Sequence, residues 1–113
     1  MFALPDHYID QLETPCVVID ERVARENIAR MQRKVEEAHC KLRPHIKTHK
    51  MPYFAKLQLE AGASGICSCK ISEAEVMADA GIDDIFLAYP LVGKPKILRA
   101  ILLSQKIKRL ILS

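Results

Sequence analysis

The chain has 113 residues, half of them hydrophobic and 27% charged, a composition that suits one modest globular domain. Its net charge of +3 comes from 17 basic and 14 acidic residues, and few aromatic side chains interleave with them, so the sequence does not indicate nucleic-acid binding. No apolar stretch approaches a membrane span, the N-terminus lacks a signal-peptide pattern, and four cysteines do not make a disulfide scaffold. We therefore expect a cytoplasmic protein without membrane contact.

The first half of the chain predicts an alternation of strands and helices. Residues 15–19 form a short apolar run typical of a buried strand, and Asp20 is the expected N-cap of a helix. Residues 42–47 predict a second strand, after which Pro52 suits the first turn of a helix that Gly62 ends. The apolar face of the first helix recurs at intervals of three and four: Ala24, Ile28, Met31, Val35 and Ala38.

A third strand is predicted at residues 65–69, followed by a helix that ends at Gly81. Ser72 and Glu75 form a capping-box pattern, which predicts the start of that helix. A weak internal repeat supports successive strand and helix units, because an Ala-Gly pair with an isoleucine four residues after the glycine occurs twice. The two copies are Ala61-Gly62 with Ile66 and Ala80-Gly81 with Ile85.

The last part of the chain continues the same alternation. Residues 85–89 predict a fourth strand, Pro95 opens a helix, and residues 108–112 predict a fifth strand. The apolar side chains carried by this last helix are Leu98, Ile101 and Leu102.

The whole pattern predicts an α/β fold of parallel (β/α) units. Five strands and four helices amount to about half of a TIM-type (β/α)8 barrel, which needs ~250 residues. We expect residues 1–113 to be the incomplete N-terminal part of such a barrel. The alternative is a complete, open five-stranded sheet of the doubly wound kind.

Residues 42–50 are the most informative stretch, since they contain two histidines, two lysines and an arginine. A lysine amine that is partly desolvated and close to other positive charges can attack a carbonyl. Alternation along the predicted strand places Arg43, His45 and Lys47 on one face. The simpler interpretation is a solvated basic loop.

The direction of the predicted strands supports Lys47 as a candidate active-site residue. In parallel α/β folds the active site gathers at the carboxyl ends of the strands. Lys47, Asp20, residues 69–70 and Tyr89 each lie at the end of a predicted strand, and we expect them to face one common mouth. Tyr89 there could approach a bound cofactor or cap the core of the barrel, and the sequence favours neither.

Metal ligation is only weakly indicated. His45 and His49 are four residues apart, a spacing that serves ligation on a helix, but they straddle a strand end and a loop, and Lys50 would repel a cation. Cys67 and Cys69 share one face of a predicted strand. We expect them to be small buried thiols rather than half of a metal site.

The run Arg-Pro-His-Ile-Lys-Thr-His-Lys at residues 43–50 resembles the signature of the D-threonine aldolase and D-serine dehydratase family. That family shares the alanine-racemase-type (fold type III) pyridoxal-phosphate barrel. The similarity extends over roughly residues 12–113, with further motifs in the family's order. These motifs lie at residues 13–20, 59–66, 72–76 and 80–93.

By this resemblance, Lys47 corresponds to the lysine that forms a Schiff base with pyridoxal phosphate. His45, Thr48 and Tyr89 are its expected companions in cofactor binding. The family also implies a divalent metal, Mn or Zn, whose ligands lie in a C-terminal domain, so no residue here is assigned to it. In this family the residues that hold the cofactor phosphate lie mostly on later strands and loops, and the second catalytic group is also expected beyond residue 113.

The resemblance implies a lyase acting on small D-amino acids. The reaction is either aldol cleavage of D-threonine-like 3-hydroxy amino acids or dehydration of D-serine, with racemisation a weaker third possibility. The alternative is a non-catalytic fragment or cofactor-binding module that needs a partner or the missing C-terminal half. We also expect a homo-oligomer, most simply a dimer, because sheet edges at residues 15–19 and 108–112 would lack neighbours. The isolated chain is expected to be inactive.

Overall fold

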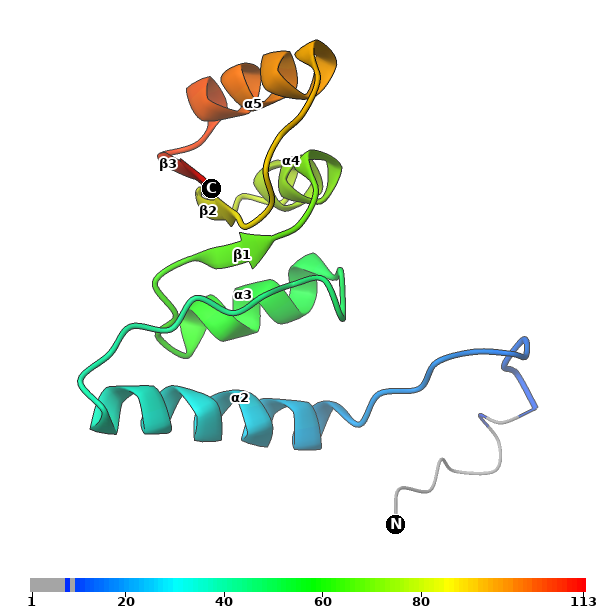
Figure 1. Cartoon of the computed structure of the whole chain (residues 1–113). Helices are drawn as coiled ribbons and strands as arrows, with labels where there is room; N and C mark the ends of the chain where they lie inside the picture. The colour runs from blue at the N-terminus through cyan, green and yellow to red at the C-terminus, as the bar shows by residue number, and fades with distance from the viewer. Residues whose placement is uncertain (1–7, 9) are drawn as a thin grey trace.

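The fold is a small parallel sheet with helices packed against it, seen in a computed structural model that describes residue 8 and residues 10–113. Helices and strands alternate along most of this range (Figure 1). The elements in chain order are α2 (Glu21–Glu37), α3 (Pro52–Glu60), β1 (Ile66–Ser68), α4 (Ile71–Asp79), β2 (Asp84–Leu87), α5 (Lys94–Lys106) and β3 (Arg109–Leu112).

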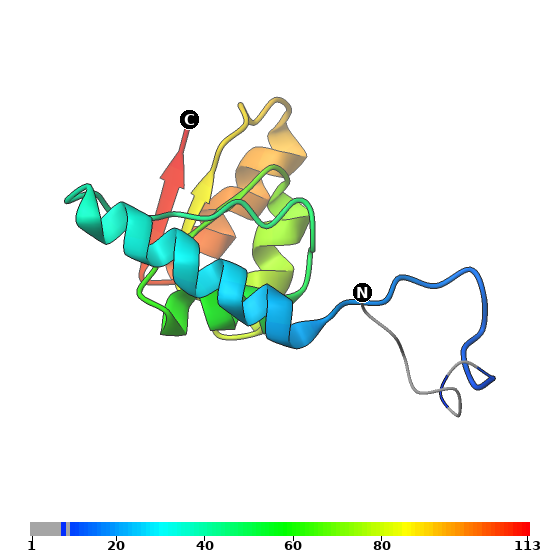
Figure 2. The same ribbon diagram turned by 90° about the horizontal axis from the view of Figure 1, so that it is seen from below.

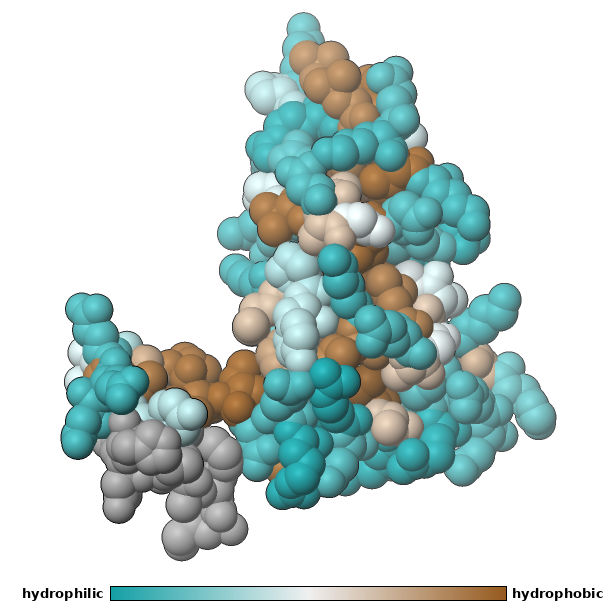
Figure 3. Space-filling view, turned by 180° about the vertical axis from the view of Figure 1, so that it is seen from behind, coloured by the Kyte–Doolittle hydropathy of each residue, from teal (hydrophilic) through white to brown (hydrophobic). Residues whose placement is uncertain are grey.

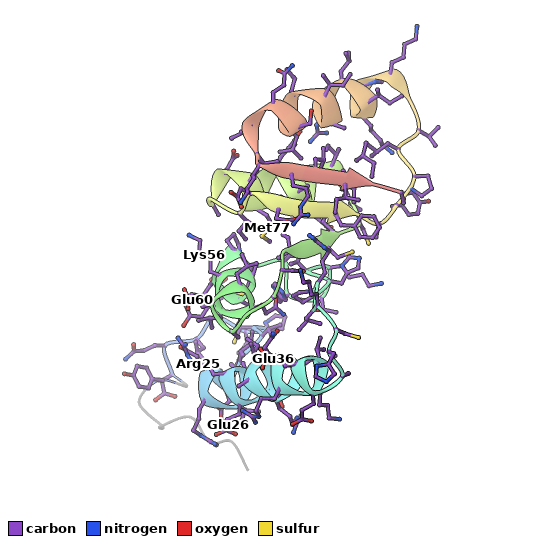
Figure 4. All side chains as sticks on the ribbon, turned by 90° about the vertical axis from the view of Figure 1, so that its left-hand side faces the viewer. Arg25, Glu26, Glu36, Lys56, Glu60 and Met77 are labelled. Carbon is purple, nitrogen blue, oxygen red and sulfur yellow. The ribbon has the colours of Figure 1, made fainter. Side chains whose placement is uncertain are left out.

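Helix α2 begins where the sequence predicts, because the Asp20 carboxylate accepts a hydrogen bond from the Val23 backbone N–H at 3.1 Å. The side of α2 that packs against α3 carries Gln32, which is buried, and Glu36, which accepts from its amide at 2.9 Å. Figure 4 shows Glu36 on this side and Glu26 on the opposite one. Met31, expected on the apolar face, is half exposed.

Helix α3 follows the expected local signals closely. Pro52 occupies its first turn, and the helix closes at Ala61, followed by Gly62 with φ of +117°. Phe54 and Leu57 are buried between α3 and the rest of the molecule. The side chain of Gln32 lies so close to Gly62 that a Cβ there would be 2.8 Å from its amide nitrogen, so α2 and α3 meet at this glycine.

The three strands are parallel and stand in the order β1-β2-β3. Since parallel crossovers share one hand, consecutive neighbouring strands place their connecting helices on the same face of the sheet. Helices α4 and α5 do lie side by side there (Figures 1 and 2). A doubly wound sheet would carry helices on both faces, so this arrangement favours the barrel-type expectation.

The hydrophobic core lies between the sheet and these helices. On the face shown in Figure 3, hydrophobic residues gather along the middle of the molecule between hydrophilic margins. Core residues from the strands and from α4 and α5 are almost completely buried. They include Ile66, Ile85, Leu87, Ile71, Ala74, Met77, Ala100 and Leu103.

The prediction of a first strand at residues 15–19 is wrong. This segment forms no strand and pairs with no other segment, and Val17 is 91% exposed. A strand needs a neighbour that takes its backbone hydrogen bonds, and no strand of the described residues lies beside it. Valine and isoleucine content alone therefore overestimated strand formation at this position.

The predicted second strand, residues 42–47, is also not a regular strand. It forms one parallel bridge, between His45 and Cys67, with hydrogen bonds from Ile46 N–H to Cys67 O and from Cys67 N–H to Pro44 O. Pro44 has no N–H to donate, and the chain turns at residues 46–49. The segment therefore lies along the edge of β1 without extending the ladder, and the sheet has three strands among the described residues instead of the five predicted.

Helix α4 begins earlier than the capping-box pattern predicts. Lys70 is its N-cap residue, without a side-chain cap, and Ser72 lies inside the first turn. The carboxylate of Glu73 accepts a hydrogen bond from the Cys69 backbone N–H at 3.3 Å and supports the start of the helix in place of Ser72.

Helix α5 opens with Pro95 in its first turn, as expected. Its buried residues are Ala100 and Leu103, whereas a row of larger apolar side chains is 46–65% exposed. This row consists of Ile97, Leu98, Ile101 and Leu102.

Candidate functional site

The register of the sheet brings the chemistry-bearing residues of separate segments onto one face. His45 pairs with Cys67, Cys67 pairs with Phe86, and Phe86 pairs with Ile111. Register partners in parallel strands point to the same face. Lys47 lies in the turn that follows His45, and Cys69 lies just beyond the end of β1, so both residues are at the carboxyl ends of their segments.

The segment that carries Lys47 is fastened at its beginning by Arg43. The Arg43 guanidinium donates from Nη1 to Asp84 Oδ1 at 2.7 Å, with a second, longer contact to the Ile66 carbonyl. Burial alone would raise the pKa of Asp84, but the ion pairs with Arg43 and Arg109 outweigh it and leave that pKa below its usual value. The ionised cluster ties residues 42–47 to β2 and β3 across β1.

The Lys47 turn is fastened at its other end by Ile46. Ile46 is fully buried, and its carbonyl accepts a hydrogen bond from Lys50 N–H at 2.8 Å, with Lys50 in the left-handed region at φ of +52°. Lys47 itself is exposed. Its backbone N–H donates to His45 Nδ1 at 3.1 Å. The lysine therefore sits on a fixed backbone with a free side chain.

His45 connects the Lys47 turn to the end of β1. Its Nε2 lies 3.3 Å from the sulfur of Cys69. Cys69 is held in turn by Glu73, which accepts from its backbone N–H and also pairs with Lys50 Nζ at 3.4 Å. Lys50 belongs to the same turn as Lys47, so these contacts close a ring around the candidate site.

The other two residues of the basic run take different places. Thr48 is exposed at the outside of the turn. His49 faces α3, where its ring meets Phe54 edge to face at a centroid distance of 5.9 Å and its Nδ1 accepts from Met51 N–H. Burial lowers the pKa of His49, and the nearby side chain of Gln58 offsets this only in part, with no well-formed hydrogen bond to Nε2. His49 is thus a packing residue.

A pocket of about 400 Å³ opens at the carboxyl ends of β1 and β2. Cys69 and Tyr89, both expected near the mouth, line it together with three cationic side chains, Lys70, Lys96 and Arg99. Tyr89 is 61% exposed. Asp20, also expected at the mouth, lies elsewhere, in a hollow at the start of α2.

The cysteines divide by burial. Cys67 is buried, which raises the pKa of its thiol, whereas Cys69 is half buried just beyond the end of β1. Within residue 8 and residues 10–113, no group of three or more His, Cys, Asp and Glu side chains could hold a metal ion. In the same residues, none of the helices combines the length and apolarity needed to cross a membrane.

Two features of the site escaped the sequence interpretation. The contact between His45 and Cys69 joins residues 24 positions apart, and the ion pair of Arg43 with Asp84 joins residues 41 positions apart. Both become visible only once residues 42–47 are paired with β1 in the correct register. The alternation of side chains was a usable signal for His45, but its partner could not be chosen without that register.

The sequence of this chain matches known proteins over most of its length. The family model described as the alanine racemase N-terminal domain matches residues 19–106. D-threonine aldolase of Arthrobacter sp is 39% identical over 95 residues, which cover 84% of this chain and 25% of that protein. D-threo-3-hydroxyaspartate dehydratase of Delftia sp. is 46% identical over 77 residues, 68% of this chain and 20% of that protein.

A solved structure agrees with the fold. The crystal structure of D-threonine aldolase from Filomicrobium marinum superposes with a TM-score of 0.85 at 35% identity, covering 88% of this chain and 27% of that one. The chain therefore belongs to the alanine racemase N-terminal domain family, and its parallel strands and one-sided helices match the N-terminal part of that TIM-type barrel. It spans about a quarter of the length of the relatives it matches.

Proposed function

We propose that these residues supply the cofactor-bearing part of a pyridoxal-phosphate-dependent lyase for small D-amino acids, with Lys47 as the lysine that holds the cofactor. The observation that carries the proposal is the position of Lys47. Its amine is exposed, and its backbone is fixed at the carboxyl end of a segment that Arg43 and Ile46 fasten to the sheet. Active sites of parallel α/β folds lie at this end.

The residues around Lys47 fit an anionic aldehyde such as pyridoxal phosphate. An exposed primary amine is available for covalent attachment. Lys50 belongs to the same turn, with its amine paired to Glu73, and Lys70 adds a positive charge to the pocket at the carboxyl ends of the strands. His45, Thr48 and Tyr89 are proposed to contact the cofactor. When bound, the cofactor supplies an electron sink for charge that develops at the substrate α-carbon.

The chain's own contribution is to orient groups and move a proton. Lys47 Nζ would serve as the base that takes the proton from the substrate α-carbon. The hydrogen bond from Lys47 N–H to His45 Nδ1 fixes the direction in which this side chain leaves the backbone. The ring of contacts through Cys69 and Glu73 keeps the turn from shifting when substrate enters.

The substrate class follows from the matched relatives. D-threonine and D-threo-3-hydroxyaspartate both name 3-hydroxy D-amino acids, in which a hydroxyl group lies one carbon from the α-carbon. Aldol cleavage of D-threonine-like substrates and dehydration of D-serine are the two proposed reactions. A divalent metal, Mn or Zn, is part of the proposal for the whole enzyme, but the described residues offer no ligand set, so we derive no step through it.

Location and assembly complete the proposal. The described chain has four free cysteines and no disulfide, which suits the reducing cytoplasm. A homo-oligomer, most simply a dimer, is supported by β3, which pairs on only one side among the described residues, and by the exposed apolar row of α5. The alternative is a cofactor-binding module that needs a partner. It would use the same Lys47 site as the lyase, so the two proposals differ in activity and not in cofactor binding.

The experiment is to add pyridoxal phosphate, reduce with borohydride and map the labelled peptide. We expect the pyridoxyl group on Lys47. Lys47→Ala should lose the label, whereas the matched variants Lys50→Ala and Lys70→Ala should keep it. A label on Lys50 or Lys70, with none on Lys47, would contradict the assignment.

A further inference from the structure

The thiol of Cys69 is a reactive group to which the proposed lyase function assigns no chemical step. The Cys69 sulfur and His45 Nε2 lie 3.3 Å apart, although the two residues come from different segments. An imidazole that a third group orients can stabilise the thiolate form of a neighbouring cysteine by donating a hydrogen bond to its sulfur. Here the orienting group is the backbone N–H of Lys47, which donates to His45 Nδ1.

The hydrogen bonds define which nitrogen faces the sulfur. Because His45 Nδ1 accepts the proton of Lys47 N–H, the ring proton of a neutral imidazole lies on Nε2 and points at Cys69. An N–H group and nearby ammonium groups are the surroundings in which cysteine reacts most readily. Glu73 adds a backbone restraint by accepting from Cys69 N–H.

The same cysteine lines a pocket of about 400 Å³ whose wall is positively charged. Lys70 and Lys96 contribute cationic side chains to it, as does Arg99, which is already paired with Glu75. Tyr89 provides an aromatic surface. Such a pocket favours a small molecule that carries carboxylates, because local positive potential raises the concentration of anions near the thiol.

We propose that Cys69 is a modification site that forms mixed disulfides with small anionic disulfides. The Cys69 sulfur attacks one sulfur of the disulfide, so that a new S–S bond forms as the original one breaks. The other half leaves as a thiolate and receives the proton that Cys69 gives up. One disulfide is exchanged for another, so no further oxidant is required. The adduct would break the contact between Cys69 and His45.

The test uses the unmodified 113-residue chain and compares cysteines within one molecule. Cys16 and Cys40 are exposed and Cys69 is half buried, so accessibility alone predicts that Cys69 reacts more slowly than either of them. The probes are glutathione disulfide, which is anionic, hydroxyethyl disulfide, which is neutral, and cystamine, which is cationic. Mixed disulfides are quantified at each cysteine by peptide mapping after short incubations.

We expect glutathione disulfide to modify Cys69 faster than Cys16 or Cys40, on the order of tenfold, through electrostatic attraction and the His45 contact. The preference for glutathione disulfide over cystamine should be larger at Cys69 than at Cys16. In concentrated urea the three cysteines should react alike, which shows that the folded structure causes the difference. If folded Cys69 reacts no faster than Cys16, or shows the same charge preference, the proposal is overturned.

Two variants separate the contributions of charge and of the imidazole. Lys70→Ala should reduce the preference for glutathione disulfide over cystamine at Cys69 and slow the neutral probe less than it slows glutathione disulfide. His45→Gln should slow all three probes at Cys69 and none at Cys16. The proposal would also be overturned if Lys70→Ala left the charge preference at Cys69 unchanged and His45→Gln left the reaction rates at Cys69 unchanged. A variant that fails to fold is recognised because its Cys69 then reacts like Cys16 in the same sample, as both do in concentrated urea.

Discussion

The guanidinium of Arg43 reaches across Gly65 and binds the carboxylate of Asp84, with 2.7 Å between Arg43 Nη1 and Asp84 Oδ1. This contact joins the segment that carries Lys47 to the strand on the far side of β1. Both side chains are less than one-fifth exposed. The candidate site therefore depends on an ion pair at the opposite end of the strands from its chemistry.

Arg43→Met should lower the free energy of unfolding by about 2 kcal/mol, because the methionine fills similar space but leaves a partly buried carboxylate with fewer hydrogen bonds. The measurement is urea denaturation followed by circular dichroism. Arg22→Met is the matched control, since Arg22 pairs with Glu26 on the exposed surface of α2 and should change stability by less than about 0.5 kcal/mol. Equal effects of the two substitutions would refute the role of Arg43.

Gly65→Ala should be strongly destabilising, by about 3 kcal/mol, because a Cβ at this position would lie 2.7 Å from the Asp84 carbonyl oxygen and closer still to Arg43. Gly81→Ala is the control. Gly81 also has positive φ, but its Cβ would meet nothing within 4 Å, so only backbone strain of about 1 kcal/mol is expected. Thermal unfolding of the two variants gives the comparison, and similar melting temperatures would count against close approach at Gly65.

The buried position of His49 predicts a pH dependence of stability. Burial lowers the pKa of His49 in the folded chain below its ordinary value of 6.5. As pH falls below 6.5, the unfolded chain binds a proton more readily than the folded chain, so stability decreases until the lower folded pKa is passed. His49→Gln should flatten this part of the stability curve. His39→Asn, at an exposed position with positive φ, is the control and should leave the slope unchanged.

The helices could be predicted well because their signals are local. Asp20 caps α2 by contacting a backbone N–H three residues away, and Pro52 and Pro95 lie in the first turns of α3 and α5. Gly62 takes the left-handed backbone that ends a helix. These residues act within one or two turns of their own position, so the sequence around each is sufficient.

The strands were harder to predict, because a strand forms only where another strand takes its backbone hydrogen bonds. Residues 15–19 and 42–47 were both predicted as strands, yet the first is unpaired and the second forms only one bridge. For the candidate site, the sequence singled out Lys47 through its motif and its position at the end of a predicted strand, and the role of Lys47 stays a prediction. It could not find the contact between His45 and Cys69, since that distance depends on the register between two separate segments.

The exposed apolar row of α5 predicts self-association. Leu98 and Leu102 lie one turn apart on the helix and are 61% and 65% exposed. Exposed aliphatic side chains in one row and a strand edge beside them favour contact with another molecule. Sedimentation velocity should show a concentration-dependent dimer or larger species, and the double substitution Leu98→Glu with Leu102→Glu should shift the equilibrium toward monomer. A cleanly monomeric parent chain at high concentration would contradict this prediction.

The 113 residues alone should hold pyridoxal phosphate but show no measurable cleavage of D-threonine or deamination of D-serine. The chain spans about a quarter of the length of its relatives, and Lys47 is exposed on a turn. Both reactions need the substrate carboxylate and hydroxyl held in place, and such positioning is worth on the order of 7–11 kcal/mol. The assay adds cofactor with Mn or Zn and uses Lys47→Ala as the control. Turnover well above that control would show that these residues already form a complete active site.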